Sequence, residues 1–174
     1  STKEESSPTG LPCGAISGLL ASAQKRIVRR MYVAPLWTGE LDDPDDRFYT
    51  LARYAAVKDV AFITTANPSS TIKLVETMQR YCDRLLRDIR DGTFRPPGGH
   101  IPAGARTSRF KPNPALAGRL EGLVKTDGCL LPKHVWNLTF LTNWTGGTLR
   151  LYLKRLRELF GHLPIFDIGL LASE

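Results

Sequence analysis

Two short stretches near the end of the chain combine residue types that could bind a phosphorylated ligand. In residues 144–148 (WTGGT), paired glycines would let a flat or charged group approach the backbone closely. The N–H groups of a helix that follows would favour a phosphate at the same place. In Ser173-Glu174, a hydroxyl lies beside a carboxylate. This pair could bind a phosphate oxygen and hold a magnesium ion, which prefers oxygen ligands.

A plainer interpretation of the same residues stays open. Thr145 would be a helix N-cap, Gly146 and Gly147 would form a turn, and Ser173-Glu174 would begin another helix. Spacing alone favours this interpretation, because a Gly-Gly turn is a weak signal. The sequence also has no GxxxxGK[ST] loop and no strand-linked GxGxxG, so it is neither a P-loop protein nor a Rossmann dinucleotide-binding protein.

Alternating strands and helices must position these residues. Apolar residues at helical spacing predict amphipathic helices, and short β-branched or apolar runs predict buried strands. Asn67-Pro68 should begin the second helix and Asp91-Gly92 should end it. The expected order is a helix at 48–55, a strand at 60–65, a helix at 69–90, a helix at 115–124, a strand at 135–144, a helix at 149–160 and a strand at 164–171.

This order predicts an α/β fold, a layered and mainly parallel sheet with flanking helices. Strands that alternate with helices are typical of right-handed crossovers. Residues 1–10 are polar and should form a flexible lead-in, and residues 11–174 should form one α/β segment. Ligands of such sheets gather at the carboxyl ends of the strands, where both stretches above would lie.

The formal net charge of +7 in 174 residues favours an anionic partner. The arginines of residues 79–95 alternate with Asp83, Asp88 and Asp91, which is typical of a solvated helix with local ion pairs. No block of five like charges occurs, so nucleic acid is not expected to be the main partner. A basic nucleic-acid-binding module remains the alternative from another functional class.

Cysteine and hydropathy patterns predict a cytoplasmic protein. Three separated cysteines without a CxxC pair argue against a disulfide scaffold and against a zinc site. No apolar stretch is long enough to cross a membrane, and no signal peptide opens the chain. Among the tryptophans, only Trp144 adjoins the glycine loop, where its ring could stack on an aromatic ligand.

Several segments together resemble the GH3 family, which is named for auxin-responsive proteins and belongs to the adenylate-forming superfamily. They are TANPSSTIKLVETMQRYCDRLLRDIRDGTF, LTNWTGG and FGHLPIFDIGLLASE, and GLPCGAISG resembles the part downstream of the family's first nucleotide motif. The resemblance implies the large N-terminal domain of an acyl-acid amido synthetase. It also implies ATP and Mg²⁺ as cofactors, a carboxylic acid substrate, and an amine or amino acid as acceptor.

The resemblance assigns roles to individual residues. Trp144 would line the acyl pocket, and Glu174 would be catalytic and bind magnesium. The hydroxyl of Ser173 would contact the α-phosphate. The first position of that second motif is often Tyr in plant members, whereas Gly169 or Leu170 stands here. The nucleotide-binding residues would be Thr145, Gly146, Gly147, Thr148, Gly169, Ala172 and Ser173.

Two other family elements are not evident in the sequence. STKEESSPTG is a poor match to the loop that grips the β- and γ-phosphates, and the third nucleotide motif would follow Glu174. The chain is therefore expected to be an internal segment of a larger enzyme that is inactive without the remainder. Transfer of the acyl group to coenzyme A, instead of an amine, stays an open alternative.

Overall fold

The computed structural model describes residues 5–6, 12–13, 32–102, 105 and 110–169 of the chain. Its centre is a parallel sheet of three strands, β3 (Phe62–Thr64), β4 (Phe140–Asn143) and β5 (Ile165–Asp167), in the order β3-β4-β5. Ile63 pairs with Leu141, and Leu141 pairs with Ile165. The predicted α/β fold with a parallel sheet and flanking helices is confirmed. A separate antiparallel pair joins β1 (Glu5–Ser6) to β2 (Pro12–Cys13).

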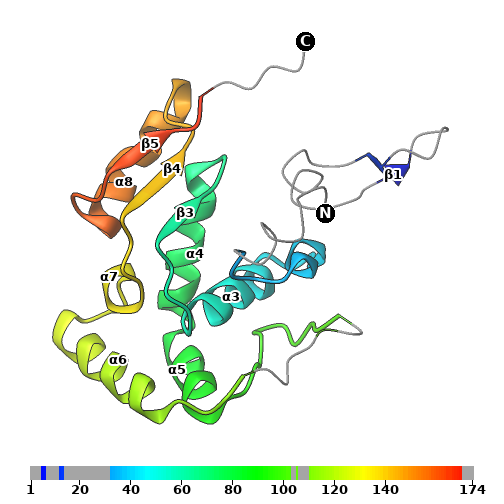
Figure 1. Cartoon of the computed structure of the whole chain (residues 1–174), viewed down its shortest axis with the longest axis vertical. Coiled ribbons are helices and arrows are strands. Elements are labelled where there is room, and N and C mark those ends of the chain that lie inside the picture. The colour runs from blue at the N-terminus through cyan, green and yellow to red at the C-terminus, as the bar shows by residue number, and fades with distance from the viewer. Residues whose placement is uncertain (1–4, 7–11, 14–31, 103–104, 106–109, 170–174) are drawn as a thin grey trace.

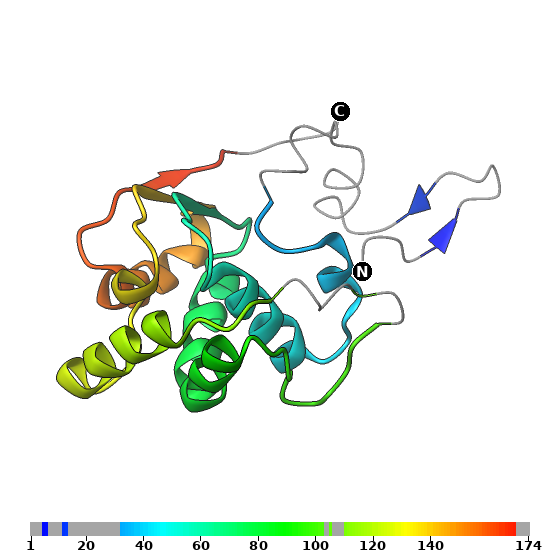
Figure 2. The same cartoon turned by 60° about the horizontal axis from the view of Figure 1, so that its bottom comes forward.

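Helices α4 (Pro68–Arg80) and α8 (Leu151–Phe160) pack on one face of the sheet (Figures 1 and 2). Leu141, Val75 and Leu156 are fully buried in the core between them. Both helices have an apolar stripe at 3.6-residue spacing, and burying that stripe is the main source of their stability. The remaining helices continue this layer away from the sheet. They are α3 (Pro44–Ala55), α5 (Cys82–Asp91), α6 (Pro114–Asp127) and α7 (Pro132–Val135).

Helix ends follow the predicted signals where local chemistry decides them. The Asn67 side chain accepts a hydrogen bond from Ser69 N at 2.9 Å and so begins α4. Gly92 ends α5 in the left-handed conformation, with φ at 68°. The predicted helix at 69–90 is nevertheless two helices, because the chain leaves helical geometry at Tyr81. There the Tyr81 hydroxyl donates to Asp45 Oδ2 at 2.7 Å, which fixes the junction to α3.

The predicted strands are longer than the observed ones. Val135 belongs to α7 instead of a strand, and pairing begins only at Phe140. The strand at 60–65 was predicted to be buried, yet Phe62 is 47% exposed. The helices cover only the opposite face of β3, so the alternate residues of that strand stay open. Two 3-10 helices also occur, η1 (Leu36–Glu40) and η2 (Gly147–Arg150), and η2 forms the first turn of the predicted helix at 149–160.

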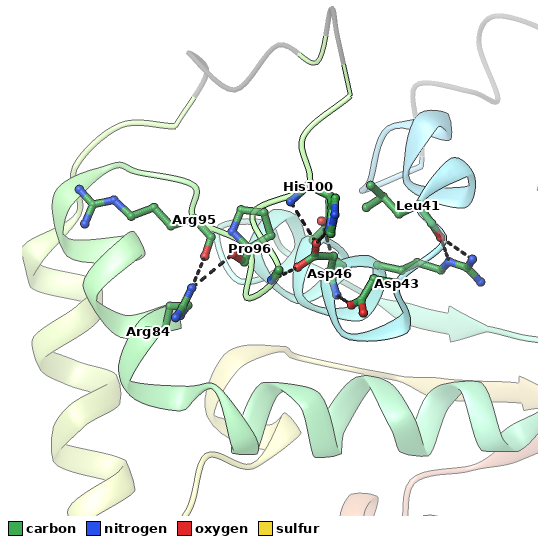
Figure 3. A network of polar contacts seen from close by, with 10 residues as sticks. Leu41, Asp43, Asp46, Arg84, Arg95, Pro96 and His100 are labelled. Carbon is green, nitrogen blue, oxygen red and sulfur yellow. Dashed lines mark hydrogen bonds and ion pairs between the residues drawn. The ribbon is translucent and has the colours of Figure 1, made fainter.

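The loop after α5 is held against α3 by one buried carboxylate (Figure 3). Asp46 Oδ1 accepts a hydrogen bond from Gly98 N at 2.6 Å, and Asp46 Oδ2 accepts one from His100 N at 3.1 Å. His100 Nδ1 lies 2.8 Å from Asp46 Oδ2. These contacts order a segment that its Pro and Gly content alone indicates only as a surface loop.

Candidate ligand site at the carboxyl edge of the sheet

The carboxyl ends of β3, β4 and β5 lie at one edge of the sheet, as parallel pairing requires (Figure 1). Backbone hydrogen bonds extend the pairing beyond the strands. Trp144 N donates to Ala66 O at 3.0 Å, and Ile168 N donates to Asn143 O at 3.2 Å. The loop after β4 and the start of the segment after β5 are therefore neighbours, whereas residues 171–174, which were predicted to lie beside the loop, are outside the described residues.

Asp167 joins these two segments. Its Oδ2 accepts hydrogen bonds from Thr145 N at 3.0 Å and from the Thr145 hydroxyl, and its Oδ1 accepts from Gly169 N at 2.7 Å. The hydrogen bond from the Thr145 side chain, followed by the two backbone N–H groups, lowers the pKa of the Asp167 carboxyl. Trp144 closes the connection, because its Nε1 donates to Gly169 O at 2.9 Å.

The paired glycines differ in what their backbone requires. Gly147 has φ at +57°, a left-handed conformation that favours glycine. Gly146 has φ at −82° and ψ at 166°, which any residue adopts. A Cβ added at Gly146 would meet no atom of the described part of the chain within 4 Å. The described residues therefore do not require glycine at residue 146, and they leave the space beside it open.

Asn143, Thr65 and Thr71 form a polar cluster next to this edge of the sheet. Asn143, fully buried at the end of β4, donates from Nδ2 to Thr65 O at 3.1 Å and also contacts the hydroxyls of Thr65 and Thr71. Thr71 lies in the first turn of α4, so one amide ties two strands and a helix together. Asn143 Oδ1 is buried without a partner among the described residues. This cluster fixes the position from which the loop at 144–148 departs.

The structure brings together one part of the predicted site and does not describe the other. Thr145 and Gly169 are joined by hydrogen bonds to Asp167, and Trp144 donates to Gly169 O. Gly146 follows Thr145, and Gly147 and Thr148 begin η2. Ala172, Ser173 and Glu174 lie outside the described residues, so their roles stay predictions. Thr145 is not a helix N-cap. Gly146 takes that place, and the Thr145 hydroxyl donates to Asp167 instead.

Sequence reasoning missed Asp167 and Asn143. The position of Asp167 at a strand end, two residues before a glycine, was the available signal, since such a carboxylate often accepts from nearby backbone N–H groups. Asn143 gave no comparable signal, because its partner Thr71 is distant in sequence.

Magnesium has no complete site among the described residues, where no group of three or more His, Cys, Asp or Glu side chains could hold a metal ion. Asp167 is the carboxylate at this edge, and its oxygens already accept three hydrogen bonds. No step is therefore assigned to a metal on the described residues, and Glu174 as its ligand stays a prediction.

The arginine-bearing helices form ion pairs, but not with the interleaved aspartates that the sequence indicated. Arg80 pairs with Asp45 of α3 at 3.1 Å. Arg90 pairs with Glu121 of α6. The local pairing predicted with Asp88 was wrong, because Asp88 turns inward to accept from Tyr49, Thr93 and Arg95. No helix in the described part of the chain is long and apolar enough to cross a bilayer.

Fold and site together define a class, an α/β protein with an open, glycine-containing edge at the carboxyl ends of a parallel sheet. The comparison with family models is specific within this class. The GH3 family N-terminal domain matches residues 1–165. The chain therefore belongs to the GH3 family, as its sequence resemblance indicated.

Solved structures give the same fold. One described as "GH3.15 acyl acid amido synthetase" is similar with a TM-score of 0.75 and 19% identity, covering 99% of this chain and 32% of that one. Another, "AtGH3.15 acyl acid amido synthetase in complex with 2,4-DB", has a TM-score of 0.59 and 23% identity over 72% of this chain and 23% of that one. The chain thus spans about a third or less of these structures. No curated protein matches it.

Proposed function

We propose that the protein to which this chain belongs joins a carboxylic acid to an amine at the expense of ATP. In the first step a carboxylate oxygen of the acid attacks the α-phosphorus of ATP, which forms an acyl-adenylate and releases pyrophosphate. In the second step the nitrogen of an amine, commonly an amino acid, attacks the acyl carbon. An amide forms, AMP leaves, and the amine loses a proton. Family membership and the similarity to acyl acid amido synthetases support this proposal.

The conformation and surroundings of Gly146 are the observation that supports a ligand site at this edge of the sheet. The backbone conformation of Gly146 suits any residue, and no described residue fills the space that a side chain would take there. A glycine at this place would allow a ligand to lie close against the backbone. The edge where it lies is the usual ligand position of a parallel α/β sheet.

The chain's own residues would hold and orient the ligand. N–H groups at the start of the helix that begins at Gly147 have no partner within that helix, so they can face an anionic group. Trp144 is 41% exposed while its Nε1 donates to Gly169 O, and its ring would form one wall of the proposed acyl pocket. Thr145 precedes this helix, and Thr148 lies in its first turn.

Residues outside the described part complete the proposal. Ser173 would contact the α-phosphate, Ala172 would let the backbone pass close to the nucleotide, and Glu174 would bind magnesium. When bound, magnesium would neutralise phosphate charge. Because adenylation places charge on phosphorus, it requires preorganised donors and cations more than a nucleophilic side chain. A location in the cytoplasm stays part of the same proposal.

Pyrophosphate exchange into ATP, measured with the full-length gene product and a panel of aryl, indolyl and fatty acids, tests the proposal. We expect exchange that depends on one class of acid and that Glu174→Ala abolishes. A folded protein that shows no exchange with any acid would contradict adenylation. Exchange followed by transfer only to coenzyme A would contradict the amine as acceptor.

A further inference from the structure

A second charged site lies away from the sheet edge, on α5 and the loop that follows it. A pocket of about 190 Å³ is lined by Arg84, Arg87, Asp88 and Arg95. In Figures 1 and 2 α5 lies at the opposite end of the helical layer from the carboxyl ends of the strands. The pocket is therefore separate from the candidate site at residues 144–148.

None of the three arginines at this pocket has an ion-pair partner within the described part of the chain, whereas Arg80 and Arg90 on the same stretch of helix are paired with Asp45 and Glu121. Arg84 and Arg87 are three residues apart and therefore neighbours on the surface of α5. Three arginines without an ion pair thus line one pocket, and an anion bound there would offset their like charges.

The pocket is held in shape by contacts to the backbone. Arg84 Nη1 lies 3.3 Å from the carbonyl oxygens of both Arg95 and Pro96, which places the side chain against the loop (Figure 3). Arg95 N donates to Asp88 Oδ2 at 2.8 Å, so the loop is fixed on the other side as well. Each guanidinium has five N–H donors, and most of those on Arg84 and Arg95 stay free for a ligand.

Asp88 offsets only one of the three positive charges that line the pocket. It is 1% exposed, and its oxygens accept hydrogen bonds from three uncharged donors, the Tyr49 hydroxyl, the Thr93 hydroxyl and Arg95 N. The carboxylate thus forms part of the interior wall. The lining therefore carries three positive charges and one negative charge, and this balance favours an anion.

We propose that this pocket binds the phosphate group of a small anion. Guanidinium groups form paired hydrogen bonds with the oxygens of phosphate, and several arginines around one small space match its tetrahedral array of acceptors. The proposal needs neither ATP nor an acid substrate, so it can hold or fail independently of the adenylation reaction.

Titration of the 174-residue chain with inorganic phosphate, followed by NMR, tests the site directly. We expect saturable shifts of the Arg84, Arg87 and Arg95 side-chain resonances and of the Arg95 amide. In Arg87→Gln/Arg95→Gln the affinity should fall about ten-fold or more, because two charge-assisted hydrogen-bond donors are lost. Arg84 stays unchanged in this variant, since it also anchors the loop.

Three controls decide between the alternatives. Lys125→Gln/Lys154→Gln removes the same charge from α6 and α8 and should leave the affinity within about two-fold. Gly146→Ala should also keep phosphate binding, which separates this pocket from the sheet edge. Shifts that do not saturate, or an equal loss in the lysine variant, would overturn the proposal. Arginine shifts caused by a single-stranded oligonucleotide but not by phosphate would overturn it in favour of a polynucleotide.

Discussion

Neighbouring glycines at residues 146 and 147 have different physical reasons to be glycine. Gly147 adopts a left-handed conformation, and Gly146 does not. The fold therefore favours glycine at residue 147. At residue 146 the fold does not, and we attribute that glycine to the proposed ligand. The sequence alone does not distinguish these two glycines. The turn into η2 sets their backbone conformations, which the residue type does not reveal.

Alanine substitution should separate the two glycines. We expect Gly147→Ala to lower the free energy of unfolding by about 1–2 kcal/mol, the cost of a left-handed conformation with a Cβ. Gly146→Ala should change it by less than about 0.5 kcal/mol. Urea denaturation of the two variants measures both values. Equal destabilisation would show that residue 146 is also constrained by the fold.

Asp167 should make the stability of the sheet edge depend on pH. Hydrogen bonds from Thr145 and from Gly169 N lower the pKa of Asp167 in the folded state. Its stabilising contribution is therefore complete above the unfolded pKa, about 3.9, and is lost as the pH falls through the lower folded value. We expect Asp167→Asn to be less stable than the unmodified chain at pH 7, with a difference that shrinks below about pH 4. A difference that is constant from pH 7 to pH 3 would contradict this account.

At the scale of elements, a buried carboxylate connects α3, α5 and the loop after α5. Asp88 accepts hydrogen bonds from the Tyr49 hydroxyl at 2.7 Å and from the loop at Arg95 N. Burial, and then the hydrogen bond to Asp88, raise the pKa of Tyr49, so its hydroxyl stays protonated as the donor. This interior contact ties a surface loop to the helical layer.

Removal of that hydroxyl should weaken the connection. We expect Tyr49→Phe to cost about 1–2 kcal/mol of unfolding free energy, because Asp88 loses a buried donor. Tyr152→Phe, at an exposed tyrosine of α8, is the matched control and should cost less than about 0.5 kcal/mol. Thermal or urea denaturation measures both. A Tyr49→Phe protein as stable as the control variant would contradict the role given to this contact.

Local sequence signals predicted the type and order of the elements, and the capped helix ends, better than they predicted the lengths of the strands. Asn67 and Gly92 mark their helix ends correctly, because a cap depends on neighbouring atoms only. The break at Tyr81 was missed, since it depends on a contact with Asp45, which is remote in sequence. Predicted strands were too long for the same reason, because pairing partners decide where a strand begins.

At the scale of the whole molecule, one face of the sheet has no helical layer among the described elements. Phe62 and Phe140 stack with ring centroids 4.9 Å apart, and Phe140 and Phe166 meet edge to face at 5.6 Å. Phe62 and Phe166 are 47% and 55% exposed. Parallel sheets are normally covered on both faces. The residue pattern of the strands alone could not predict that these aromatic side chains are exposed.

The aromatic face should make the isolated 174-residue chain associate with itself. Sedimentation velocity over a range of concentrations should show oligomers, because exposed aromatic rings gain by leaving water. Phe62→Ser/Phe166→Ser should shift the distribution toward monomer without loss of the fold. Leu151→Ser, at an exposed leucine of α8, serves as the control and should leave the distribution unchanged. A chain that stays monomeric at every concentration would contradict the prediction.

The central claim is that a nucleotide approaches the backbone at Gly146, and acid-dependent pyrophosphate exchange by Gly146→Ala in the full-length protein tests it most directly. A methyl group there meets no atom of the described residues, yet it would occupy the space given to the ligand. We expect a variant that folds as stably as the unmodified protein and loses about ten-fold or more of its exchange rate, a transition-state loss of at least about 1.4 kcal/mol. Exchange at the unmodified rate by this variant would place the nucleotide elsewhere and contradict the claim.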